Sequence, residues 1–96
     1  MKINNTEYTT PVLNFSNVCK LENWGIAVDN MGARPLGLLA GFTALAVGGK
    51  SLEDGEAAVD AHIAGGGNLS DIAAALNEAI ESSGFFKATA EQTAKT

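Results

Sequence analysis

The chain has 96 residues, enough for one small domain, and its 46% hydrophobic and 18% charged residues exclude wholesale disorder. A net charge of −5 at pH 7 argues against a nucleic-acid partner, because phosphate backbones bind basic surfaces. Residues 1–50 carry a net charge of +1 and residues 51–96 one of −6, which is typical of a solvated acidic face and leaves a basic partner as the alternative.

Residues 2–10 predict a short N-terminal β-hairpin. The stretch alternates weakly, is rich in Thr, and has Asn4 and Asn5 at its centre. Asparagine tolerates the positive φ angles that tight hairpin turns require. Pro11 lacks a backbone N–H, so we expect it to end the second strand or to place it at an edge.

A first helix is predicted over residues 14–24. Asn14 or Ser16 is a suitable N-cap, since either side chain can accept a hydrogen bond from the first helical turn. Gly25 is expected in the left-handed conformation after the helix, with Ile26 folding back over its last turn. The side expected to be buried holds Phe15, Val18, Leu21 and Trp24.

After a connector at residues 28–34, a central helix is predicted over residues 35–47. Pro35 fits a first helical turn, where its missing amide has no partner in any case. The run from Leu36 to Val47 is apolar nearly all round, which predicts burial on most sides. Gly37 and Gly41 lie four residues apart, which permits the backbone to come close to a neighbour and predicts tight packing, and Gly48-Gly49 is expected to end the helix.

The spacing of Ser51 and Asp54 is that of a capping box and predicts a third helix over residues 51–64. Its early carboxylates suit the positive end of the helix dipole, which explains much of the acidity without a ligand. Gly65-Gly66-Gly67 predicts a break after this helix. The side facing the core is expected to hold Leu52, Gly55, Val59 and Ile63, with His62 half-buried.

The best-specified helix is predicted over residues 69–83. Asn68 is expected to cap it and Asp71 to complete a capping box. Gly84 is expected to stop it, with Phe85 folding back over its last turn. The apolar stripe holds Leu69, Ile72, Leu76 and Ile80, widened by Ala73, Ala75 and Ala79. The sequence thus predicts a mainly α domain, a hairpin and about four helices over residues 1–87, followed by a flexible tail at 88–96.

The inventory of reactive residues predicts a protein that is not an enzyme and binds no cofactor or metal. His62 is the single histidine and Cys19 the single cysteine, so an internal disulfide is excluded and a histidine-rich zinc site lacks ligands. No apolar signal-peptide segment follows Met1, which predicts a cytosolic protein. The most apolar run, 36–49, is shorter than the roughly 18 residues of a membrane span, so no membrane association is expected.

The order of several short features resembles a known family. They are Lys2-Ile3-Asn4 with Tyr8, Phe15 followed by Cys19-Lys20-Leu21-Glu22 and Gly25, Pro35-Leu36, Ser51-Leu52-Glu53-Asp54, Ile63 with Gly65-Gly66, and Ser83-Gly84-Phe85-Phe86. In this order the chain resembles the small tail assembly chaperones of long-tailed bacteriophages and prophages of Gram-positive bacteria. It departs from them at Asn4-Asn5, where the family commonly has Asn-Gly.

The resemblance implies a role in assembly and no catalytic residues. Such proteins bind the tape measure protein in the bacterial cytoplasm while the tail tube assembles, and they are absent from the mature virion. In many of these phages a programmed frameshift gives a second, longer form. The major tail protein and further copies of the chain are additional candidate partners.

A chaperone needs exposed apolar surface, and Phe85 and Phe86 are the residues expected to supply it, with Trp24 as a further candidate. The alternative is that these rings belong to the core of a small domain. Two other functions stay open from the sequence: a minor structural or connector protein of a phage particle, and a small acidic regulatory binding protein.

Overall fold

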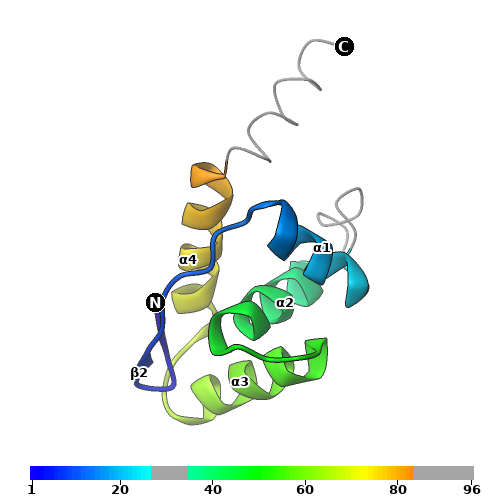
Figure 1. The fold of residues 1–96 in the computed structure, drawn as a ribbon. Helices are drawn as coiled ribbons and strands as arrows, with labels where there is room; N and C mark the ends of the chain where they lie inside the picture. The colour runs from blue at the N-terminus through cyan, green and yellow to red at the C-terminus, as the bar shows by residue number, and fades with distance from the viewer. Residues whose placement is uncertain (27–34, 84–96) are drawn as a thin grey trace.

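The computed structural model describes residues 1–26 and 35–83. Within these residues, a two-stranded hairpin precedes four helices, which confirms the predicted fold class (Figure 1). Helix α2 lies between α1 and α3, while α4 runs beside this stack and the hairpin lies next to α4. The elements are β1 (Lys2–Ile3), β2 (Thr6–Glu7), α1 (Phe15–Asn23), α2 (Pro35–Val47), α3 (Leu52–Ala64) and α4 (Leu69–Ser82).

The hairpin turns at the two asparagines, as predicted. Lys2 pairs with Glu7 and Ile3 with Thr6, so Asn4 and Asn5 form a two-residue loop. Their φ angles are 49° and 65°, the positive values that a type I′ hairpin turn demands. The second strand ends at Glu7, well before Pro11, so it is shorter than the sequence suggested.

Helix α1 has the predicted start and stop. The Asn14 side chain, and not that of Ser16, accepts a hydrogen bond from the Asn17 N–H at 2.9 Å. Gly25 has a φ of 93°, and the Ile26 N–H donates to the Leu21 carbonyl at 2.8 Å, as in a Schellman motif.

One residue expected on the buried side of α1 is exposed. Val18 and Leu21 are buried and Trp24 is half-buried, but Phe15 is 71% exposed. The helical spacing places Phe15 on the same face as Val18, yet this face is covered at Val18 and largely uncovered at Phe15. Spacing alone therefore identified the face correctly but not how far it is covered.

Helix α2 has the predicted bounds and forms the centre of the core. Its residues 38–44 are all buried, and Phe42 has no exposed surface. Leu36 is 69% exposed, however, so the prediction of burial from Leu36 onward is wrong for the first turn. The helix stops at Gly48, whose φ is 72°, and the Gly49 N–H donates to the Ala44 carbonyl at 2.8 Å.

The axes of α2 and α3 turn through 91°, and glycine makes this crossing close. A Cβ atom at Gly55 would overlap the carbonyl group of Ala40, so the two helices touch through backbone. Gly41, where tight packing was expected, lies directly against the Leu21 side chain, which a Cβ atom would overlap.

The two capping boxes predicted for α3 and α4 differ in outcome. The Ser51 side chain makes no cap hydrogen bond, so the prediction for α3 is wrong. The Asp54 carboxylate instead accepts from the Lys50 N–H at 2.7 Å, one residue before the expected donor. At α4 the box is complete: Asn68 accepts from the Asp71 N–H, and Asp71 accepts from the Asn68 N–H.

Helix α4 buries Ile72, Ala75, Leu76 and Ala79 against the core, whereas Leu69 at its start is 38% exposed. It ends at Ser82, and the Ser83 hydroxyl donates to the Leu13 carbonyl at 2.8 Å. The predicted stop at Gly84 and Phe85 lies outside the described residues.

No single helix in residues 1–26 and 35–83 has both the length and the apolar character to cross a membrane. Among the described helices, α2 and α3 taken together are long and apolar enough to cross a membrane, but the pair is bent by 91° at the loop between them.

Candidate functional site

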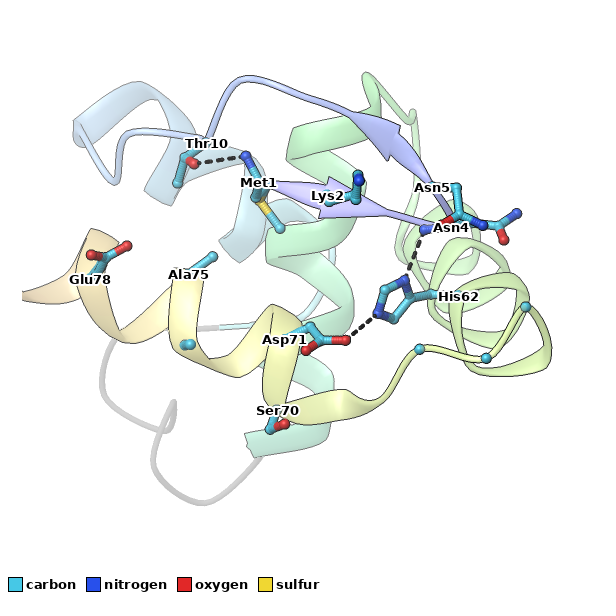
Figure 2. Close-up of a pocket in the computed structure, with 14 residues that line it drawn as sticks. Met1, Lys2, Asn4, Asn5, Thr10, His62, Ser70, Asp71, Ala75 and Glu78 are labelled. Atoms are coloured by element: carbon cyan, nitrogen blue, oxygen red, sulfur yellow. Dashed lines mark hydrogen bonds and ion pairs between the residues drawn. The ribbon is translucent and has the colours of Figure 1, made fainter.

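His62 joins three elements and is more buried than the sequence suggested. Its exposed fraction is 6%, and its ring lies between the hairpin and the start of α4 (Figure 2). The Asn4 N–H donates to His62 Nδ1 at 2.8 Å, and His62 Nε2 lies 3.1 Å from Asp71 Oδ2. Because Nδ1 accepts a hydrogen bond, the proton of the neutral ring belongs on Nε2, from which it donates to Asp71.

The glycines after α3 make room for this ring. Gly66 has a φ of 99°, and the Gly67 N–H donates to the His62 carbonyl at 2.9 Å, which closes another Schellman motif. A Cβ at Gly67 would overlap the His62 ring. The glycine run predicted as a break is therefore an ordered helix stop on which His62 packs.

The carboxylate of Asp71 accepts hydrogen bonds that act on its ionisation. The hydrogen bond from the Asn68 backbone N–H, and after it the bond to His62, lower the pKa of the Asp71 carboxyl group. Both bonds favour the ionised form, because a carboxylate accepts hydrogen bonds more strongly than a carboxylic acid does. Asp71 is solvent-exposed, so this shift reflects local capping more than a buried reactive group.

An open cavity of about 690 Å³ lies beside His62, lined by the hairpin, the glycine run and the first half of α4 (Figure 2). Two of its polar groups are bonded to each other, since His62 Nε2 lies 3.1 Å from Asp71 Oδ2, and the Met1 amino group donates to the Tyr8 carbonyl at 2.7 Å. In the described part of the chain, no three His, Cys, Asp or Glu side chains come together as metal ligands. The bonds of His62 connect the hairpin, α3 and the start of α4.

A second surface has the opposite character. A shallow groove of about 450 Å³ lies where the start of α2, the outer side of α3 and the start of α4 meet. We call it the apolar groove; it is lined by Leu36, Leu39, Leu52, Val59, Ile63 and Leu69. The carboxylates of Glu56 and Asp60 also line it, and its described lining holds no cation.

The apolar groove was missed by the sequence prediction, which placed Leu36, Ile63 and Leu69 in the interior. They are 69%, 45% and 38% exposed, respectively. Leu36 and Leu69 belong to first turns and Ile63 to a last turn, where a neighbouring helix covers less of the face. The position of large apolar residues in the first or last turn of a helix was the feature of the sequence that could have indicated this exposed surface.

A third exposed apolar surface lies beside the end of α4. Val12 is 64% exposed and lines a depression shared with Glu81 and Ser82. The bond from Ser83 to Leu13 holds this segment against the end of α4. Together with Phe15, Val12 gives this end of the domain two large exposed apolar side chains.

The structure places one of the three predicted partner-binding residues. Trp24 is half-buried against the core, and its Nε1–H donates to the Lys50 carbonyl at 3.2 Å, which ties the end of α1 to the loop before α3. Phe85 and Phe86 lie outside the described residues. Cys19, the single cysteine of the sequence, lies on α1 and is partly buried.

Comparisons with known proteins identify no relative. No family model, no curated protein and no solved structure matches the chain.

Proposed function

We propose that this protein is a phage tail assembly chaperone that binds the tape measure protein non-covalently during tail tube assembly. The proposed client surface lies at the C-terminal end of α4, where Phe85 and Phe86 follow. The proposal originates in the resemblance of residues 1–87 to that family. In this role the protein acts in the host cytoplasm, is not an enzyme and does not enter the mature virion.

The observation that carries the proposal is the exposed apolar surface next to the end of α4. Val12 and Phe15 are 64% and 71% exposed, and the Leu13 carbonyl between them is bonded to Ser83. Phe85 and Phe86 follow Ser83 by only two and three positions. Two exposed apolar side chains next to this point support an extended apolar contact for a client.

The acidic second half supports the same role. Residues 51–96 carry a net charge of −6, and Glu53, Asp54 and Glu56 are exposed on α3. Like charges keep copies of the protein apart, so a chaperone with exposed apolar surface stays dispersed while it holds its client.

The test is co-expression with the tape measure protein of the same phage, with the soluble client measured after affinity capture. Wild type should keep the client soluble, and Phe86→Ala should weaken binding about tenfold or more, because burying a phenyl ring contributes about 1.5–3 kcal/mol. Phe86→Leu is the matched control, since it keeps an apolar side chain and should lose less. Circular dichroism and thermal melting of each variant separate lost binding from lost folding.

Each outcome decides a separate part of the proposal. A well-folded Phe86→Ala protein that still holds the client would remove Phe86 from the surface. A wild type that leaves the client insoluble would refute the chaperone function. Finding the protein in purified virions would favour a structural or connector role.

A further inference from the structure

We infer that the apolar groove is a second docking surface and that it receives an amphipathic helix flanked by lysine or arginine. The groove and the surface proposed for the tape measure protein lie at opposite ends of α4. A helix of 14 residues rises about 21 Å, so one short segment cannot fill both surfaces. This inference does not depend on the chaperone function.

The exposed residues of the groove favour a partner with an apolar surface. Leu36, Ile63 and Leu69 come from three helices and line one depression. Scattered single apolar residues are normal on a protein surface, but a contiguous group around a hollow marks an interaction site.

The walls of the groove favour a partner whose backbone hydrogen bonds are all internal. They are formed by α2, α3 and the start of α4, whose main-chain groups bond mostly within each helix. The described strands, β1 and β2, do not line it, so it offers no sheet edge to an extended peptide. A helix meets this requirement, because its own backbone hydrogen bonds are internal.

The negative charge of the groove favours a partner helix with basic residues beside its apolar stripe. Glu56 and Asp60 stand one turn apart on α3, both exposed, at the side of the apolar residues. Lysine or arginine beside the apolar stripe of a partner helix would meet them, and complementary charge speeds association and excludes wrong partners.

The same charges disfavour a second copy of this chain as the occupant. Two grooves facing each other would bring Glu56 and Asp60 of one copy towards those of the other, and the chain as a whole carries −5. Like charges opposed across an interface are unfavourable.

The binding test uses the full chain and a synthetic helical peptide with leucines at i, i+3, i+4 and i+7 and lysines on both sides of them. Fluorescence anisotropy gives its Kd, and the methyl resonances of Ile63, Leu36 and Leu69 report the place of binding. The matched peptide carries glutamate for every lysine. We expect the lysine peptide to bind at least about tenfold more tightly, with the difference shrinking as salt shortens the Debye length from about 10 Å to about 3 Å.

Two sets of variants separate the apolar and the charged contributions. Ile63→Ser should weaken binding about tenfold or more, and Leu36→Ser, at the more exposed position, should act in the same direction if Ile63→Ser fails to fold. Val12→Ser, outside the groove, is the control. The pair Glu56→Gln and Asp60→Asn should remove the preference for lysine, whereas Glu53→Gln with Glu81→Gln changes the charge equally outside the groove and should preserve it.

Three results of the binding test would overturn the inference. They are no binding of the lysine peptide, equal binding of the lysine and glutamate peptides at low salt, and unchanged binding by folded Ile63→Ser and Leu36→Ser proteins. A wild-type dimer that dissociates in Ile63→Ser would also overturn it, since the groove would then belong to a second copy. None of these results bears on capture of the tape measure protein, so the two proposals fail separately.

Discussion

The two ends of α3 pack in opposite ways. Near its start, Gly55 meets the backbone of Ala40 on α2, and the contact exists because a side chain is missing. Near its end, His62 reaches the Asn4 N–H and Asp71 with its two ring nitrogens, and the contact exists because a polar side chain is complete. Adding side-chain atoms at Gly55 should therefore destabilise the fold, whereas at His62 the fold should be destabilised by removing them.

Adding atoms at Gly55 should have the largest effect on stability. A Cβ there would overlap backbone atoms of Ala40, which cannot rotate away as a side chain can. We expect Gly55→Ala to lower the free energy of unfolding by about 2–3 kcal/mol, and Gly55→Val to prevent folding. Urea denaturation followed by circular dichroism measures both.

The sign of the change is informative, because Gly→Ala inside an exposed helix normally stabilises by up to about 1 kcal/mol. A Gly55→Ala protein as stable as wild type would show that α2 and α3 can separate at this crossing. Gly48→Ala is the control for the conformational cost alone, because Gly48 has a φ of 72° and a Cβ there would meet no atom within 4 Å. This variant should lower the free energy of unfolding by only about 1 kcal/mol.

Removing atoms at His62 should have the next largest effect. His62→Ala leaves the Asn4 N–H without its acceptor and opens a cavity between the hairpin and α4, so we expect a loss of about 2–3 kcal/mol. His62→Gln keeps a polar side chain and should lose less. Hydrogen exchange of the Asn4 amide should accelerate in His62→Ala, and unchanged exchange would show that His62 does not hold the hairpin.

Removing the N-cap side chains of α3 and α4 should change the stability less than the substitutions at Gly55 and His62. Asn68→Ala should lower the free energy of unfolding by about 1 kcal/mol, because Asn68 accepts the hydrogen bond from the Asp71 N–H. Ser51→Ala should change it by only a few tenths, since the Ser51 side chain makes no cap bond. Equal losses would mean that Ser51 caps α3 in solution.

Local signals in the sequence were enough for most of the fold. Periodic apolar residues, the N-caps Asn14 and Asn68, and the glycines after α1 and α2 each act within a few residues, so the sequence shows them directly. The capping box at Ser51 is not formed because both groups of Asp54 bond elsewhere: its N–H donates to the Ser51 carbonyl at 3.2 Å, and its carboxylate accepts from the Lys50 N–H. Spacing cannot decide between such local alternatives.

The surfaces were harder to predict, because they depend on residues distant in the chain. His62 contacts Asn4 across 58 positions, and nothing near His62 in the sequence points to the hairpin. Leu36, Ile63 and Leu69 have core-like spacing, and only the ends of the packed helices leave them exposed. The prediction of Phe85 and Phe86 as client contacts remains a prediction, since both lie outside the described residues.

The smallest expected effect is the dependence of stability on pH through Asp71. Its pKa is lower in the folded protein than in the unfolded chain, so the unfolded chain binds more protons as the pH falls through the ordinary aspartate value of about 3.9. The stabilisation that Asp71 provides is therefore complete above this value and is lost as the pH falls towards the folded-state pKa. The free energies of unfolding of wild type and Asp71→Asn should accordingly differ most near neutral pH and converge as the pH falls through the lowered pKa of Asp71. Because the Asn68 backbone bond is the larger cause, NMR titration of His62→Gln should show the pKa of Asp71 rising only part of the way to its ordinary value. A full return would make His62 the main cause, and identical pH profiles for wild type and Asp71→Asn would show that neither bond stabilises the fold.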